Sequence, residues 1–91
     1  MNYQEQEEYD VETLPAQEYE HKIILFNDDV NTFDYVIDML ISICDHSPEQ
    51  AEQCAMIVHY KGKCCVKSGS YEDLEPRCAA LLNGGLSAEI Q

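Results

Sequence analysis

Three polar residues stop an apolar run at one point of the chain, and a histidine follows later in a similar apolar setting. Asn27, Asp28 and Asp29 come directly after "HKIILF", and His59 lies within "MIVHYKGK". If the fold brings these side chains together, an amide oxygen, carboxylates and an imidazole nitrogen surround one point. An ammonium group offers three hydrogen-bond donors and no acceptor, and its bonds to such acceptors are charge-assisted. The pattern therefore favours an ammonium-binding site beside an apolar pocket.

Simpler interpretations of the same residues stay open from the pattern alone. Asn and Asp often close turns through side-chain bonds to the backbone, and a histidine near the end of a helix is stabilised by the helix dipole. The acidic residues could also bind Mg²⁺ or Ca²⁺, but a calcium-binding EF-hand loop counted from Asp28 or Asp29 lacks Gly at its sixth position and Glu at its twelfth. No nucleophile with a base and an orienting group is recognisable. We therefore expect no catalytic residue, no metal and no cofactor.

Periodicity predicts the elements that would position these residues. Residues 21–26 form a mostly buried strand in this prediction. Thr32 can cap a first helix. The apolar residues of that helix share one face: Phe33, Val36, Ile37, Leu40, Ile41 and Cys44. Ser47, Pro48 and Gln50 form the start of a second helix, which Gly62 ends. Its buried residues are predicted as Ala51, Cys54, Ala55 and Val58.

A third helix is predicted after Ser70, which can act as its N-cap. Pro76 lacks an amide hydrogen, so we expect this helix to kink or to begin only near Glu75. Asn83-Gly84-Gly85 ends it. The apolar face of this helix carries Leu74, Cys78 and Leu81.

Strands precede and follow the third helix in the prediction. "KCCVKSG" forms the second strand, and "LSAEIQ" alternates in the manner of a third. The order β-α-α-β-α-β predicts one compact α+β domain, with a three-stranded antiparallel sheet and three helices.

The acidity of the chain is uneven. The formal net charge is −13 over 91 residues, and residues 1–20 hold seven acidic residues and no Lys or Arg. We therefore predict a flexible acidic N-terminal extension over residues 1–20 and a core domain over residues 21–91. So acidic a chain disfavours nucleic acid as a partner. No apolar run approaches the roughly 20 residues of a membrane span, so no membrane partner is expected.

The five cysteines show no spacing typical of zinc ligands. Cys44, Cys54 and Cys78 fall at apolar helical positions and are predicted to be small core residues. Cys64 and Cys65 are adjacent in a predicted strand, where their side chains point to opposite faces. With no signal-peptide pattern at the N-terminus, this usage indicates a reducing cytoplasmic environment.

Two segments together resemble a known family. "HKIILFNDDVNTFDYVIDML" followed by "AEQCAMIVHYKGK" is similar to ClpS, the adaptor of a Clp AAA+ protease in the N-end rule pathway. The resemblance covers about residues 21–91. It implies that the chain binds N-degrons, which begin with Leu, Phe, Tyr or Trp, and delivers them to a ClpA- or ClpC-type AAA+ unfoldase working with ClpP.

The resemblance also assigns residues. It implies that the free α-amino group is bound by Asn27, Asp28, Asp29 and His59. It places the first side chain in a hydrophobic pocket of Asn31, Phe33, Val36, Ala55, Val58 and Leu86. It places unfoldase docking on the third helix, at Glu72 and Arg77.

Two positions depart from the family pattern. Phe33 stands where the family commonly has Met, and Ala55 stands where a larger Met is common. An alternative function is a substrate-independent regulator that binds the N-domain of the unfoldase without a working pocket. A more distant alternative is an acidic metal-binding domain.

Overall fold

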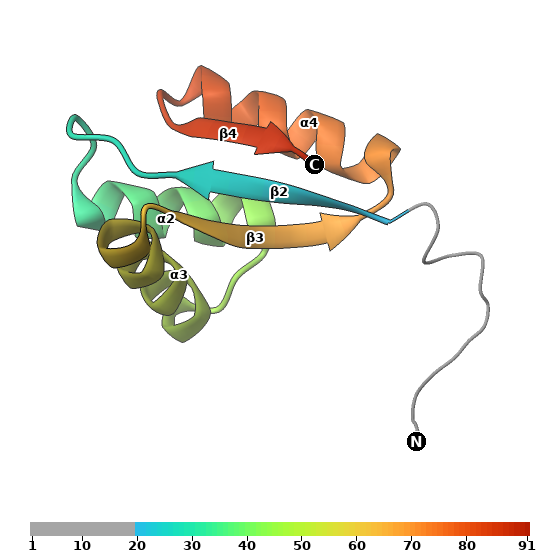
Figure 1. Ribbon diagram of the computed structural model, residues 1–91. Coiled ribbons are helices and arrows are strands. Elements are labelled where there is room, and N and C mark those ends of the chain that lie inside the picture. The colour runs from blue at the N-terminus through green and yellow to red at the C-terminus, as the bar shows by residue number, and fades with distance from the viewer. Residues whose placement is uncertain (1–19) are drawn as a thin grey trace.

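The structure is a computed structural model that describes residues 20–91. The extension expected over residues 1–20 therefore lies outside the described residues, apart from Glu20. Figure 1 shows three helices and three strands in the predicted order β-α-α-β-α-β. Their bounds are β2 His21–Phe26, α2 Phe33–Cys44, α3 Pro48–Lys61, β3 Lys63–Gly69, α4 Tyr71–Asn83 and β4 Ser87–Ile90. The predicted fold class is confirmed.

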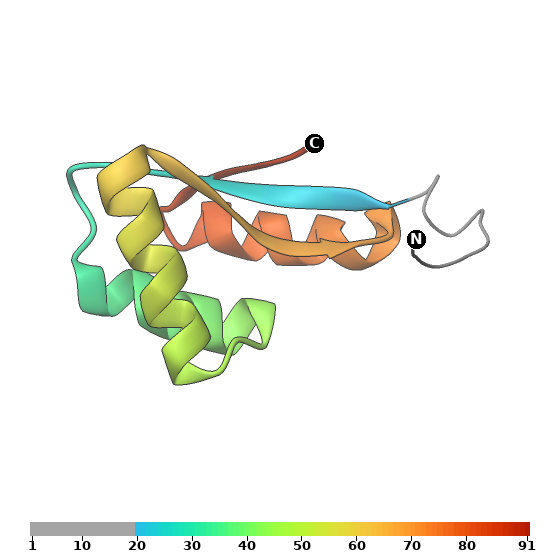
Figure 2. The same cartoon turned by 60° about the horizontal axis from the view of Figure 1, so that its bottom comes forward.

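The sheet has the strand order β3-β2-β4, with both pairings antiparallel. Figure 2 shows all three helices on one side of this sheet. Ile23 and Leu25 of β2 point to that side and are 0% and 1% exposed. Because side chains alternate along a strand, the intervening residues face away from the helices. The central strand thus buries one face against the helices and ends at Phe26, where the polar segment begins.

The predicted caps of α2 and α3 are confirmed. The Thr32 hydroxyl accepts a hydrogen bond from the Tyr35 amide at 3.1 Å. Ser47 and Gln50 form the reciprocal capping box, and Pro48 occupies the first turn of α3. Gly62 ends α3 with φ 94°, a left-handed conformation that glycine adopts without steric cost.

The predicted Ser70 cap of α4 is confirmed. Of the two effects expected of Pro76, a kink or a start only near Glu75, the late start is wrong. The helix begins at Tyr71, with the Ser70 hydroxyl accepting from the Asp73 amide at 3.1 Å. Pro76 lies inside the helix. The lost backbone hydrogen bond and the clash of its ring with the preceding turn together cost about 3 kcal/mol or more in a helix interior. Pro76 is exposed, so water can hydrate the carbonyl group that loses its partner. Burial of the opposite face offsets the loss, through Leu74, Cys78 and Leu81.

The end of α4 forms a Schellman motif, in which two backbone bonds close the last turn. The Leu86 amide donates to Leu81 O, and the Gly85 amide donates to Leu82 O, both at 3.0 Å. Gly85 takes φ 91°. Leu86, immediately after the turn, is 4% exposed. The motif therefore places Leu86 in a buried position between α4 and β4.

Burial of the cysteines follows the prediction at two of three positions. Cys44 and Cys78 are buried, whereas Cys54 is only partly buried. Burial raises the pKa of the Cys44 thiol to about 11 and that of Cys64 to about 12. Cys64 is partly buried and Cys65 is exposed, as expected for neighbours on opposite faces of a strand.

Sequence reasoning missed His46, in the loop between α2 and α3. It is 8% exposed, and its Nε2 lies 2.6 Å from the Val66 carbonyl oxygen. Val66 is the residue of β3 without a partner on β2, because the register shifts between Ile23 and Ile24. The imidazole thus satisfies a buried carbonyl group that the strand pairing leaves free.

We predict that His46→Leu lowers the free energy of unfolding by about 1–3 kcal/mol, the cost of a buried carbonyl group without a donor. Urea unfolding at pH 7 measures the change. His59→Leu is the matched control, because His59 is exposed and such changes usually stay within about 0.5 kcal/mol. Equal stability of the two variants would contradict this role of His46.

Candidate functional site

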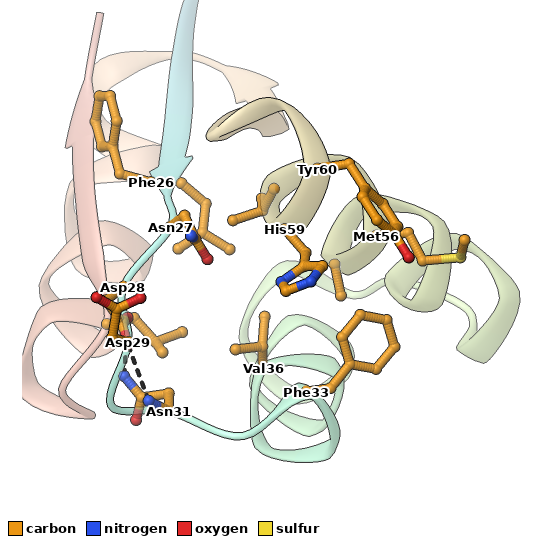
Figure 3. A pocket seen from close by; sticks show the side chains of 14 residues that line it. Phe26, Asn27, Asp28, Asp29, Asn31, Phe33, Val36, Met56, His59 and Tyr60 are labelled. Atoms are coloured by element: carbon orange, nitrogen blue, oxygen red, sulfur yellow. Dashed lines mark hydrogen bonds between the residues drawn. The ribbon is translucent and has the colours of Figure 1, made fainter.

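A cavity of about 640 Å³ opens between the end of β2, the loop after it, α2 and α3. Figure 3 shows the side chains around it. They include all ten residues that the resemblance assigns to the ammonium site and to the pocket: Asn27, Asp28, Asp29, Asn31, Phe33, Val36, Ala55, Val58, His59 and Leu86. Segments far apart in the sequence therefore meet here, although the binding roles of these residues stay predictions.

One backbone hydrogen bond brings the two polar segments together. The Asn27 amide donates to Gly62 O at 2.9 Å. Gly62 follows the last turn of α3, the turn that carries His59. Figure 3 shows the side chains of Asn27 and His59 directed toward the same space. The site thus joins the end of a strand to the end of a helix.

Asp28 builds the loop. Its Oδ1 accepts from the Val30 and Asn31 amides, both at 2.9 Å, and its Oδ2 accepts from Asn31 Nδ2 at 3.0 Å. The hydrogen bond from the Asn31 amide is the largest cause that lowers the pKa of Asp28. An ionised carboxylate has about four acceptor positions, so one remains on Oδ2. The turn interpretation therefore holds for Asp28, and it leaves room for one donor from a ligand.

Three polar side chains at the site are free within the part of the chain that the structure describes. The side chains of Asn27, Asp29 and His59 are exposed and make no hydrogen bond to residues 20–91. The His59 ring contacts the edge of the Tyr60 ring, with 4.9 Å between centroids. An amide, a carboxylate and an imidazole are thus available to one bound group.

The walls behind these polar groups are apolar. Ala55, Val58 and Leu86 are 3%, 5% and 4% exposed. Phe33, at the mouth of the cavity, is 40% exposed. Sequence reasoning missed four further lining residues: Leu25 and Phe26 at the end of β2, and Met56 and Tyr60 on α3. Met56 and Tyr60 are exposed, and their spacing of four along α3 could have placed them on the same face as His59.

The residues expected at the unfoldase surface lie on α4, and neither Glu72 nor Arg77 lines the cavity. Glu72 is exposed. Arg77 is engaged within the chain: it donates to Ile43 O at 2.6 Å and pairs with Asp45 at 3.1 Å, both at the end of α2. The side chain of Arg77 is 24% exposed. The geometry thus gives Arg77 a role in joining α4 to α2.

Comparison with known proteins agrees with this geometry. The model of the family "ATP-dependent Clp protease adaptor protein ClpS" matches residues 16–89. The chain belongs to the ClpS family. The ClpS adapter of Streptomyces coelicolor is 34% identical over 82 residues, which are 90% of this chain and 85% of that protein. The ClpS adapter of Corynebacterium glutamicum is 32% identical over 84 residues, covering 92% and 84% of the two chains.

A solved structure shares the fold. Agrobacterium tumefaciens ClpS2, bound to L-phenylalaninamide, matches with a TM-score of 0.76 and 19% identity, covering 80% of this chain and 95% of that chain. Members of the ClpS family are adaptors of Clp protease, not enzymes. Among the described residues of this ClpS protein, no helix is long and apolar enough to cross a membrane.

The hydrogen bonds of Asp28 predict a pH-dependent stability. Its pKa is lowered in the fold, so its contribution is present above the unfolded value of about 3.9 and is lost as pH falls through the lowered folded value. We expect Asp28→Asn to lower the free energy of unfolding by about 1 kcal/mol at pH 7, in the range of a lost cap. The difference from wild type should shrink in strong acid, where Asp28 is protonated.

Urea unfolding at pH 7 and at pH 2.5 measures this difference. Asp29→Asn is the matched control, because the Asp29 side chain has no hydrogen bond to residues 20–91. A loss of equal size for Asp28→Asn and Asp29→Asn at pH 7 would show that the bonds of Asp28 do not stabilise the loop.

Proposed function

We propose that this ClpS protein recognises the N-terminal residue of N-degron substrates and delivers them to a ClpA- or ClpC-type AAA+ unfoldase working with ClpP. The ligand is a free α-amino group with Leu, Phe, Tyr or Trp as the first side chain. One observation carries the proposal: unpaired acceptors and apolar walls share a single cavity.

The acceptors match an α-ammonium group in number. Asn27 offers its amide oxygen, Asp28 its one remaining acceptor position, and His59 a ring nitrogen, which accepts only when the imidazole is neutral. Asp29 adds negative charge beside them. No Lys or Arg lines the cavity, so no side chain among its lining residues competes with the ligand's cation.

The apolar walls would hold the first side chain. Val36 is partly buried, and Ala55, Val58 and Leu86 are buried. Full burial of an aromatic or leucine side chain contributes roughly 1.5–3 kcal/mol. The ligand of the related Agrobacterium tumefaciens structure, L-phenylalaninamide, joins an α-amino group to an aromatic side chain, and this supports the same pairing here.

Delivery would require a contact with the unfoldase, and α4 is the proposed surface. Tyr71 and Leu82 on this helix are 49% and 51% exposed, and exposed Glu72 lies beside Tyr71 in the first turn. The same surface would serve the alternative function, a regulator without a working pocket. Peptide binding separates the two functions.

We predict that labelled peptides beginning with Phe or Leu bind, whereas acetyl-Phe and Ser peptides bind at least about tenfold more weakly. Acetylation removes the charge and leaves acceptors that the bound peptide covers without a donor, and a hydrogen bond to a charged group is worth about 1.5–3 kcal/mol. Fluorescence anisotropy measures the affinities. His59→Ala and Asp29→Ala should weaken binding of the Phe peptide.

Asp38→Ala is the control for these variants, because Asp38 is an exposed carboxylate on α2 that does not line the cavity. Equal affinity for free and acetylated Phe peptides would refute the ammonium site. A folded protein that binds none of the peptides would instead favour the regulator.

The small side chain of Ala55 leads to a second prediction, which concerns the size of the first side chain that the pocket accepts. Ala55→Met would fill part of the cavity, so the Trp peptide should lose about tenfold more affinity than the Leu peptide, since overpacking a filled site typically costs 1–3 kcal/mol. Ala79→Met, on the exposed side of α4, is the control and should change neither affinity. A uniform loss for both peptides would show that Ala55 does not set the depth of the pocket.

A further inference from the structure

Two carbonyl groups of the turn between α4 and β4 take no part in the backbone hydrogen bonds that close this turn. The amides of Gly84, Gly85 and Leu86 are bonded back into α4, to Ala80 O, Leu82 O and Leu81 O. The Tyr35 hydroxyl donates to Gly84 O at 2.6 Å, and Asn31 Nδ2 donates to Gly85 O at 2.9 Å. One side chain from the loop before α2 and one from its first turn thus bind a turn about fifty residues later.

The fit between α2 and this turn is close at position 84, where a side chain would displace the end of the Met39 side chain. A Cβ added to Gly84 would overlap the Met39 side chain and would lie 3.1 Å from Tyr35 Oη. Tyr35 and Met39 are four residues apart on α2 and lie on one face of it. Asn31 lies in the loop just before the helix. The side chains of Tyr35 and Met39 therefore pack directly against the turn at Gly84.

Asn31 connects this turn to the acidic loop as well. Its Nδ2 also donates to Asp28 Oδ2 at 3.0 Å, and its amide donates to Asp28 Oδ1. The loop of the ammonium site and the turn of the pocket wall are therefore joined through one side chain. Asn31 is polar, and its contacts differ from those of the apolar pocket residues with which the resemblance grouped it.

Leu86 lies between this turn and the sheet. Its amide belongs to the last turn of α4, and the next residue, Ser87, already pairs with Phe26 of β2. Leu86 is 4% exposed and lines the cavity. A shift of the turn would therefore move a wall of the pocket.

We propose that Asn31 and Tyr35 are positioning residues of the pocket, which hold the carbonyl groups of Gly84 and Gly85 and thereby fix Leu86 as its wall. We call these two side chains the turn clamp. The inference rests on the proposed function, since it states how that site keeps the shape that selects a first side chain. Neither residue needs to touch the ligand for this role.

Tyr35→Phe tests the clamp with the smallest change, because it removes only the hydroxyl group. Tyr71→Phe is the matched control: Tyr71 is also an exposed tyrosine on a helix, and it does not line the cavity. The first measurement uses the protein without ligand. Hydrogen exchange of the Leu86 amide should become about fivefold faster in Tyr35→Phe, the effect of losing one neutral hydrogen bond. The Leu74 amide, at the other end of α4, is the internal reference and should not change.

The second measurement is a double-mutant cycle on binding of the Phe peptide. Tyr35→Phe should weaken binding about fivefold in the wild-type background and have no further effect when Leu86→Ala is present, because the clamp acts through Leu86. Equal losses in both backgrounds would overturn the proposal, and so would an unchanged exchange rate of Leu86.

Asn31→Ala carries the same test to the second member of the clamp. It should act in the same direction with a larger effect, about tenfold, because it also removes a bond to Asp28. An NMR titration should show the pKa of Asp28 rising in this variant, and an unchanged titration would overturn the link through Asn31. If the wild type binds no peptide, the proposed function fails, and the exchange rate of Leu86 alone decides the clamp.

Discussion

The candidate binding site depends on the hydrogen bond between the Asn27 amide and Gly62 O. Gly62 performs two tasks at once: its left-handed conformation ends α3, and its carbonyl group receives the chain that leaves β2. A residue with a Cβ would be strained at φ 94°. The last turn of α3 is therefore held against the end of β2, and His59 is carried to the acidic loop. Pairing of β3 with β2 then follows, since Lys63 lies opposite Phe26.

Neighbouring side chains of the acidic loop have different roles. Asp28 uses three of its acceptor positions to hold the loop, whereas Asn27 and Asp29 have side chains that are exposed. Neighbouring carboxylates repel each other, and hydrogen bonds to the backbone offset this repulsion for Asp28. By binding the backbone, one carboxylate becomes part of the scaffold and keeps the others in place. The two interpretations of this segment, turn and ligand site, are thus compatible, because different residues carry them.

Local patterns predicted the fold well, because the information lies within a few residues. Thr32 and Ser47 indicate helix starts because their hydroxyl groups accept from backbone amides. Gly62 indicates a helix end because it adopts a left-handed conformation. Ser70 was correctly predicted as the cap of α4. The late start suggested by Pro76 was wrong, because burial of the opposite helix face outweighs the local effect of the proline. His46 and the turn clamp could not be found this way. Both act on carbonyl groups of distant segments, and nothing in the sequence around them marks the partner.

The exposure of the polar groups decides how affinity and selectivity divide at such a site. Asn27, Asp29 and His59 are exposed, so an ammonium group bound there as proposed would replace water and gain about 0–1 kcal/mol, as at exposed ion pairs. The apolar walls contribute more, roughly 1.5–3 kcal/mol for a fully buried side chain. For selectivity the order is reversed, and the polar groups matter more than the apolar walls. Once a side chain closes the cavity, an acceptor without a donor loses its water, at a cost of about 1–3 kcal/mol. If the cavity binds a peptide as proposed, its polar groups therefore reject an N-terminus without a free ammonium group more strongly than they attract one that has it.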